Sequence, residues 1–287
     1  MVYIFEMKNL TIAGVPEHFN LPWHLCLEKG LFEDAGINLK WTEVPEGTGR
    51  LCQMLRDGET DIAVILTEGI VKDIAAGNPS KIVQVYVQSP LIWGIHVAAK
   101  SHFDTLGDLQ NGSVAISRYG SGSHLMAFVN AQNQGWDTAA LQFEIVNTLD
   151  GAVEALTAGR ADYFMWERFM TKPIVDKGIF RRVADCPTPW PSFVIAVRNE
   201  VLEADNGAIG TVLDILNQMT SGFKQIEGIT GLLAQRYGQK KEDIAEWITL
   251  TEWSQNKLDE PAFDAIQEQL LDLAIINTKT PFENVVG

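Results

Sequence analysis

Apolar runs and polar loops alternate along residues 10–49 of the chain. Residues 10–15 form a short apolar run, and the polar segment 16–20 follows it. Residues 22–29 begin with proline and are closed by a glycine, which predicts a helix. A second apolar run, 37–44, ends in the loop 45–49. This stretch therefore predicts a strand, a loop, a helix, a second strand and a second loop.

The same alternation continues to about residue 197. Segments with helical spacing lie between short apolar runs, and this pattern is typical of an α/β fold with mainly parallel sheets. The remaining predicted strands are residues 62–66, 81–87, 91–99, 113–117, 142–146, 161–166, 179–184 and 193–197. The helices predicted between them cover 70–75, 125–134, 149–158 and 167–177. Residues 200–287 are predicted to be almost wholly helical, and the last long helix begins at 259–261.

Two proline-containing segments, 89–90 and 187–191, interrupt the pattern, which restarts after the first. We therefore expect two lobes of similar layout, each a mainly parallel sheet flanked by helices. The first lobe comprises 1–88 plus 197–287 and the second 89–196, with hinges near 88–91 and 187–196. A chain that crosses twice between two lobes forms a hinge with a cleft, which is a common place for a ligand.

Ligands of open parallel sheets bind just beyond the carboxyl ends of the strands. Three predicted loops, 16–20, 46–49 and 67–69, follow strands of the first lobe. Loop 118–124 follows a strand of the second lobe, and Trp166 ends another. We expect these segments to line the cleft from its two sides.

The first loop carries the polar residues Glu17, His18 and Asn20, and Trp23 begins the helix after it. An aromatic face beside polar groups suits a planar heterocycle or an organic cation. The alternatives are a solvated loop histidine at His18 and a partly buried packing residue at Trp23.

Glu46 and Glu68 follow the second and third predicted strands, so both are placed to face the same cleft. Two carboxyls there can receive an amine or an aminopyrimidine, or act as acid and base. Thr48 and Thr67 can hydrogen-bond a ligand or cap their helices. The alternative for the glutamates is a position at a helix start that the helix dipole favours by itself.

Segment 118–124 opens a helix directly after a strand. Its glycines allow a tight turn, and the free N–H groups of a helix start attract an anion. Arg118 can pair with a carboxylate, sulfonate or phosphate, and Ser121 and Ser123 can donate to it. Tyr119 and His124 complete the candidate set of this loop. The alternative is an ordinary N-cap beside a surface arginine. The segment does not match the P-loop motif.

Trp166 and Trp190 are the aromatic candidates for the wall that opposes the first-lobe loops. Isolated tryptophans also serve often as core or hinge packing residues, and that alternative stays open for both.

The chain has 287 residues, of which 46% are hydrophobic and 21% charged, as in a globular protein with a sizeable core. Its net charge of −15 excludes a nucleic-acid partner, because phosphate binding needs a basic surface. Anionic membrane surfaces are disfavoured for the same reason, although a local basic patch can still hold one small anion. No apolar run approaches the length of a membrane span, so we expect no membrane insertion.

Cys26, Cys52 and Cys186 are widely spaced, which indicates neither a disulfide framework nor a zinc site. His96 and His102 form no ligand set, and we expect no metal and no cofactor. The N-terminus lacks the pattern of an export signal. We therefore expect a cytoplasmic protein; the alternative is a periplasmic or lipid-anchored protein whose signal has been removed. The unpaired cysteines favour the cytoplasm.

Four short sequence segments resemble those of a known fold. They are 27–32 with 36–37, 49–55 leading to 58–63, 106–109 with 111–115, and 155–162. Taken in this order, the segments resemble the type II periplasmic-binding-protein fold. Their local sequence is similar to the branch of that fold that binds nitrate, sulfonates and thiamine precursors. That branch includes the pyrimidine-precursor synthases of thiamine biosynthesis. The loops 44–49 and 66–69 particularly resemble a subgroup of fungal and bacterial members, some of which lack export signals.

The resemblance implies that the lobes close over a small polar ligand. In transport systems the loaded protein then docks on an ABC permease. The ligand classes are a nitrogen heterocycle, such as a thiamine pyrimidine precursor, and a small organic anion. Fungal pyrimidine synthases carry a cysteine-rich motif that is missing here, so the synthase activity is not carried over.

Three hypotheses follow. The first is a solute-binding protein without catalytic activity. The alternative is a cytoplasmic enzyme of thiamine or related cofactor biosynthesis on the same scaffold. The third is a ligand-sensing regulator that requires a partner.

Overall fold

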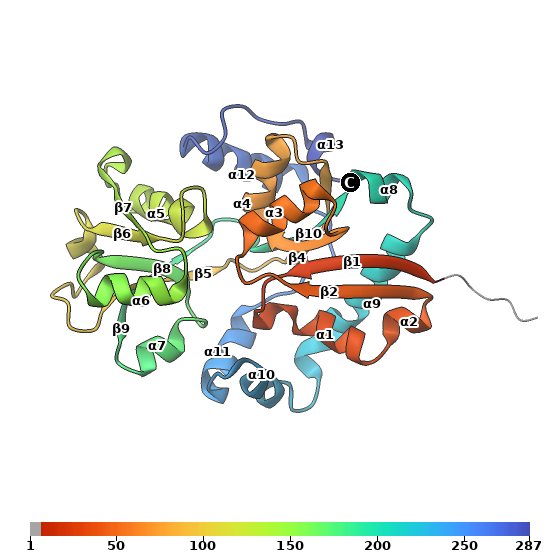
Figure 1. The fold of residues 1–287 in the computed structure, drawn as a ribbon, viewed down its shortest axis with the longest axis horizontal. Coiled ribbons are helices and arrows are strands. Elements are labelled where there is room, and N and C mark those ends of the chain that lie inside the picture. Colours follow the sequence, from red (N-terminus) through yellow and green to blue (C-terminus); the bar gives the residue numbers. More distant parts are fainter. Residues whose placement is uncertain (1–6) are drawn as a thin grey trace, which may run out of the picture. The chain divides into compact units, whose positions relative to one another are not determined.

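The computed structural model describes residues 7–287, which divide into two compact units. Unit 1 contains the described residues up to Ser89, together with Trp190–Glu268 and Thr278–Gly287. Unit 2 contains Pro90–Pro189 and Gln269–Asn277. Each unit has its own five-stranded sheet with helices on both faces (Figure 1). The first six residues of the predicted first lobe lie outside the described residues.

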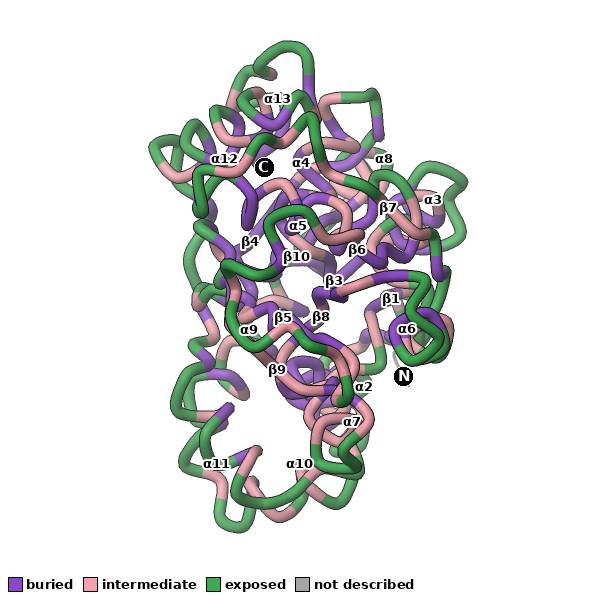
Figure 2. The backbone as a smooth tube through the Cα atoms, turned by 90° about the vertical axis from the view of Figure 1, so that its left-hand side faces the viewer, coloured by how far each residue is buried: buried purple, intermediate pink, exposed green. Residues whose placement is uncertain are grey.

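The sheet of unit 1 has the strand order β2-β1-β3-β10-β4. Its strands are β1 (Lys8–Gly14), β2 (Ile37–Glu43), β3 (Ile62–Leu66), β4 (Ser80–Val87) and β10 (Phe193–Arg198). β1 pairs in parallel with β2 and β3, whereas β10 lies antiparallel between β3 and β4. Strands β3, β4 and β10 are almost entirely buried and appear largely in purple in Figure 2. The mainly apolar sequences of β3 and β10 follow from this burial on both faces.

The sheet of unit 2 has the order β7-β6-β8-β5-β9. Its strands are β5 (Ile92–Ala98), β6 (Ser113–Ile116), β7 (Gln142–Ile145), β8 (Tyr163–Glu167) and β9 (Phe180–Pro187). β6 pairs in parallel with β7 and β8, and β5 lies antiparallel between β8 and β9. The predicted α/β class with mainly parallel sheets is confirmed, with one antiparallel strand in each sheet.

Each antiparallel strand is the first strand after a proline-containing interruption. β5 follows residues 89–90, and β10 follows residues 187–191. The predicted boundary at 196 placed residues 193–196 in the second lobe. These residues instead belong to unit 1, because β10 hydrogen-bonds to β3 and β4.

Helices α3 and α4 cover one face of the unit 1 sheet, and α1 and α9 cover the other (Figure 1). In unit 2, α5 and α6 lie on opposite faces, as right-handed crossovers to the two sides of β6 require.

The helices of unit 1 are α1 (Leu21–Glu28), α2 (Leu31–Asp34), α3 (Thr48–Asp57), α4 (Thr67–Ala75), α8 (Asn199–Glu203), α9 (Ala208–Gly222), α10 (Ile229–Tyr237), α11 (Lys241–Leu250) and α13 (Phe282–Val285). Those of unit 2 are α5 (Gly122–Asn133), α6 (Leu149–Thr157) and α7 (Lys172–Asp176). The residues of α12 (Glu260–Asp272) are divided between the units. Short 3-10 helices are η1 (His18–Asn20), η2 (Leu106–Leu109), η3 (Thr138–Ala140) and η4 (Phe223–Gln225).

Two predicted boundaries around β8 and β9 are wrong. Residues 167–177 were predicted as one helix, but only Lys172–Asp176 is α-helical. Glu167 ends β8, and its carboxylate accepts hydrogen bonds from the backbone N–H groups of Phe169 and Met170, which forms a turn there. β9 extends to Pro187, beyond the predicted end at 184. It is an edge strand, where a terminal proline is tolerated.

The two units share a local motif that ties the start of a parallel strand to its neighbour. In unit 1, Asp61 Oδ2 accepts hydrogen bonds from Thr11 N and Oγ1, both at 2.8 Å. In unit 2, Asp162 Oδ2 accepts from Ser113 N at 2.7 Å and from Ser113 Oγ at 3.1 Å. Asp61 therefore fixes the start of β3 beside β1, and Asp162 fixes the start of β8 beside β6.

Replacing either aspartate by alanine is expected to lower the free energy of unfolding by about 1–3 kcal/mol, because two donors lose a charged acceptor. Chemical denaturation of Asp61→Ala and Asp162→Ala measures the loss. Asp214→Ala is the control, since Asp214 is exposed on α9, and it should change stability by less than about 0.5 kcal/mol. Equal effects of all three variants would contradict the assignment of this motif.

Candidate functional site

Three predicted loop segments meet at one edge of the unit 1 sheet. β1, β2 and β3 are parallel, so their carboxyl ends lie at the same edge. Val44 N donates to Gly14 O at 2.8 Å, which joins the ends of β1 and β2. A Cβ atom at Gly69 would lie 2.2 Å from Thr48 Cγ2, so α3 and α4 touch at their first turns. The segment 67–69, predicted as a loop, is the first turn of α4.

His18 is fully buried at this edge, so the alternative of a solvated loop histidine is wrong. Its ring lies 4.2 Å from the Trp247 ring and 4.9 Å from the Phe19 ring, centroid to centroid. Burial lowers the pKa of His18 to about 3, so the imidazole is neutral at physiological pH. Neither ring nitrogen has a hydrogen-bond partner within the described chain. A neutral imidazole offers one donor and one acceptor.

Glu68 lies in the first turn of α4 and is 3% exposed. Trp190 Nε1 donates a hydrogen bond to Glu68 Oε2 at 2.8 Å. Burial raises the pKa of Glu68 from 4.5 to about 7, although the bonds from Trp190 and from its own backbone N–H lower it. The adjacent Thr67 N donates to Ser192 O at 3.1 Å, whereas Thr67 Oγ1 is buried and has no partner among residues 7–287.

Trp190 was predicted to join Trp166 in a wall opposite the first-lobe loops. The structure places it in unit 1, on the segment that leads into β10 and beside Glu68. Trp166 belongs to β8 in unit 2, where its half-buried ring stacks on Phe164 at 5.4 Å and meets Trp93 edge-on at 6.3 Å. The two tryptophans therefore have different roles.

The other first-lobe candidates differ in their surroundings. Glu17 is half-buried, and desolvation raises its pKa to about 7. Asn20 Nδ2 donates to Val15 O at 2.8 Å and holds the loop after β1, while Asn20 Oδ1 is buried without a partner in the described residues. Glu46 is exposed on the loop after β2. Trp23 is fully buried, in agreement with the packing alternative. Its ring lies about 6 Å from three others, those of Phe32, Trp41 and Tyr86.

The start of α5 follows β6 at the carboxyl edge of the unit 2 sheet. Ser121 is the N-cap and accepts from His124 N at 3.4 Å, and Ser123 Oγ accepts from Ser117 N at 3.0 Å. Both serine side chains therefore hold the turn, as the capping alternative states. The exposed Tyr119 ring lies 5.3 Å from the His124 ring.

Arg118 differs from the other arginines of this acidic chain. Every other arginine in the described residues forms an ion pair with a carboxylate. Arg118 is half-buried beside the N-terminus of α5, and its guanidinium group has no carboxylate partner in this part of the chain.

Sequence reasoning missed the aromatic residues that surround His18. Trp247 comes from α11 and Tyr237 from the end of α10, with its ring 6.0 Å from His18. No local pattern links residue 18 to residues more than two hundred positions away. The only sequence signal was general: the C-terminal helices had to complete the first lobe.

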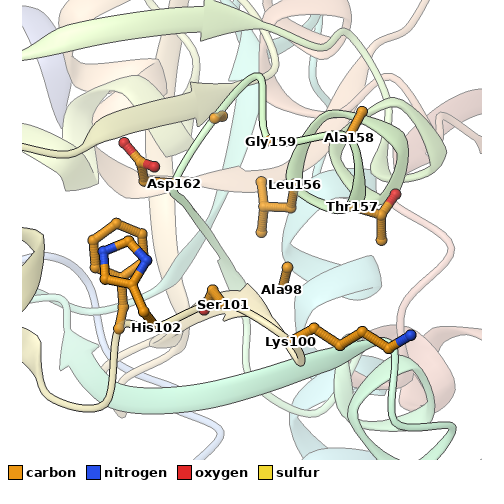
Figure 3. A pocket seen from close by; sticks show the side chains of 11 residues that line it. Ala98, Lys100, Ser101, His102, Leu156, Thr157, Ala158, Gly159 and Asp162 are labelled. Carbon is orange, nitrogen blue, oxygen red and sulfur yellow. The ribbon is translucent and has the colours of Figure 1, made fainter.

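Unit 2 also contains a cavity of about 400 Å³ that the sequence did not predict (Figure 3). It lies where β5 ends and β8 begins, at the edge of the sheet opposite to loop 118–124. Its polar lining includes Lys100, His102 and Asp162, and the Asp162 carboxylate is engaged with Ser113.

No group of histidine, cysteine and carboxylate side chains in residues 7–287 is arranged to hold a metal ion. Cys26, Cys52 and Cys186 are buried free thiols, and burial raises their pKa values. Within the same range, no helix is both long and apolar enough to span a bilayer.

The pKa of Glu68 predicts a pH-dependent stability difference between the native chain and Glu68→Gln. The unfolded carboxyl ionises near pH 4.5 and the folded one near pH 7. The carboxyl therefore contributes stability below pH 4.5 that is lost as the pH rises to about 7. At about 1.4 kcal/mol per pKa unit, Glu68→Gln should be more stable than the native chain above pH 7 by up to about 3 kcal/mol.

Denaturation of both proteins between pH 4.5 and 8 measures this difference. Glu46→Gln is the matched control, because Glu46 is exposed at the same edge, and its stability should follow that of the native chain. A constant difference between Glu68→Gln and the native chain across this pH range would contradict the raised pKa.

Comparisons with known proteins identify the fold. Residues 93–186 match the model of a family described as Ca3427-like PBP. The Candida albicans CA3427 gene product, described as having the generic periplasmic-binding-protein fold, superposes with a TM-score of 0.87 at 26% identity, over 96% of this chain and 92% of that chain. The alkanesulfonate-binding protein SsuA from Xanthomonas axonopodis pv. citri, bound to MOPS, has a TM-score of 0.79 at 18% identity. The match covers 98% of this chain and 96% of that chain. The periplasmic aliphatic sulphonate-binding protein SsuA from Escherichia coli has a TM-score of 0.75 at 18% identity. The match covers 98% of this chain and 92% of that chain.

None of the curated proteins searched matches the chain. The structural matches cover nearly the whole chain. The chain therefore has the type II periplasmic-binding-protein fold that its sequence predicted, and its second unit resembles the Ca3427-like proteins.

Proposed function

We propose that this protein binds a small polar metabolite without chemically changing it, and that it holds an anionic group of that metabolite at the start of α5. The observation that carries the proposal is Arg118, whose guanidinium group has no carboxylate partner among residues 7–287 although the chain is strongly acidic. An unpaired arginine at the carboxyl edge of an α/β sheet is placed as a ligand-binding group.

The surroundings of Arg118 support an anionic ligand group. The first N–H groups of a helix carry partial positive charge, and the turn at Ser121 exposes them beside the arginine. Guanidinium groups bind carboxylates and sulfonates through paired hydrogen bonds. Two proteins of the same fold are described as sulfonate-binding, so sulfonates are the first anions to test.

A nitrogen heterocycle, such as a thiamine pyrimidine precursor, is the second ligand class. The neutral His18 favours it, because a buried imidazole with one free donor and one free acceptor can pair with a heterocycle. A binding protein of a transport system would also require a permease partner. The permease, the cytoplasmic location and closure of two lobes over the ligand stay predictions from the sequence.

A catalytic function on the same scaffold stays the alternative hypothesis. It would need Glu46 and Glu68 to act as acid and base. Glu46 is exposed, Glu68 is buried against Trp190, and no described hydrogen bond joins their carboxyl groups. This arrangement favours binding over acid–base catalysis.

Calorimetry with propanesulfonate, propionate and MOPS tests the anion site. The native chain should bind at least one of them, and Arg118→Gln should bind it at least tenfold more weakly, because a charge-assisted pair is lost. Arg160→Gln is the control, since Arg160 is an exposed arginine of unit 2 whose ion partners are Glu144 and Glu154. It should bind like the native chain.

Equal affinities of Arg118→Gln and the native chain would exclude the anion site at α5. Failure of the native chain to bind any of these anions at millimolar concentration would also contradict it.

A further inference from the structure

The carboxyl edge of the unit 1 sheet carries two acidic residues that have no cation partner within residues 7–287. Glu68 and Glu17 follow β3 and β1, and neither takes part in an ion pair in the described chain. The neighbouring basic groups of α3 are engaged elsewhere: Arg50 pairs with Glu59, and Arg56 with Asp73. His24 of α1 lies 3.1 Å from Glu43. An incoming ligand therefore meets carboxyl groups at this edge, where the arginines of α3 are already paired with other carboxylates.

Glu68 is held in a fixed orientation. The indole N–H of Trp190 binds one carboxyl oxygen at 2.8 Å, and the backbone N–H of Glu68 provides a second donor. A carboxylate has about four acceptor positions, so two donors leave acceptor capacity unused. Thr48, which packs against Gly69, prevents the first turn of α4 from shifting toward α3.

Two further side chains at this edge are buried and have no hydrogen-bond partner. Thr67, next to Glu68 on the same helical turn, is 0% exposed, and its Oγ1 is unpaired within residues 7–287. His18 is also 0% exposed, with both ring nitrogens unpaired in that range. Buried polar groups in folded proteins almost always have partners. These atoms are therefore candidates for contacts with a bound molecule, and this observation is independent of the Glu68 carboxyl.

A continuous set of contacts connects His18 with Glu68. The Phe19 ring beside His18 lies 5.1 Å from the ring of Phe193, the first residue of β10. The preceding residue, Ser192, accepts the hydrogen bond from Thr67 N, and Trp190 lies against Glu68. All of these residues belong to unit 1. The unpaired groups and the buried carboxyl are therefore parts of one structure.

We propose that this edge is a site for an organic cation, at which Glu68 accepts a hydrogen bond from a protonated nitrogen of the ligand, an ammonium or an amidinium. The proposal rests on the proposed function, since it also concerns the binding of a small polar metabolite, and it uses residues of unit 1 alone. An anion is disfavoured here because the ionised Glu68 carboxylate would repel it. A cation would supply the charge partner that the buried carboxyl lacks, and its contact with Glu68 would be strengthened by the loss of surrounding water.

The pKa of about 7 for Glu68 agrees with this assignment. A carboxyl that served only to stabilise the fold would be expected to have an ion partner or a lowered pKa. Glu68 instead reduces the stability of the folded chain at neutral pH, and such a cost is typical of groups kept for binding.

Binding of benzylammonium and of benzyl alcohol tests the proposal, because the two molecules have the same ring and differ in charge. The native chain should bind benzylammonium at least tenfold more tightly than benzyl alcohol. Glu68→Gln should remove this preference, because glutamine retains an acceptor for Trp190 but carries no charge. Glu46→Gln, which removes an exposed carboxyl from the same edge, should retain the preference.

Propanesulfonate is measured on the same variants to separate this proposal from the proposed function. It should bind the native chain and Glu68→Gln with similar affinity. The native chain could bind propanesulfonate and yet bind benzylammonium and benzyl alcohol with equal affinity. This result would overturn the cation site and leave the proposed function intact. Retention of the preference in Glu68→Gln would likewise overturn the cation site. No binding of benzylammonium, benzyl alcohol, propanesulfonate, propionate or MOPS would overturn both proposals.

Discussion

The position of β10 between β3 and β4 determines the arrangement of the candidate site in unit 1. β10 enters the sheet against the direction of both neighbours and hydrogen-bonds to each. Its antiparallel direction brings the segment before it to the carboxyl edge of β3. Ser192 there accepts the bond from Thr67, and Trp190 reaches Glu68. Without this strand, the first turn of α4 would lack both contacts.

The same constraint explains why a carboxyl group is tolerated in a nearly enclosed position. Removing a carboxylate from water is costly unless donors or a cation replace the water. The structure supplies Trp190 Nε1 and the start of a helix, which favour the charged form, but burial outweighs them. The result is a carboxyl that is close to half-ionised at neutral pH. Such a group responds strongly to the charge of a neighbouring ligand, and this property links the energetics of the fold to the proposed binding.

Much of the fold follows from local sequence. The apolar run 62–66 is β3, and the run 37–44 is β2 to within one residue, because buried strands need little beyond apolar side chains and turn residues at their ends. The sequence also placed Glu68 and Arg118 at strand ends. It did not predict Trp190 as the partner of Glu68, since 122 residues separate them. It assigned Trp23 a possible ligand contact, whereas three aromatic rings enclose that side chain.

The ionisation of the Glu68 carboxyl tests the central claim most directly. Its ¹³C resonance can be assigned by comparison with Glu68→Gln and followed from pH 3 to pH 9, with and without benzylammonium. We expect a midpoint near pH 7 in the free protein and a lower midpoint in the presence of benzylammonium, because a bound cation stabilises the charged form. A midpoint near 4.5 that does not move when benzylammonium is added would contradict the account.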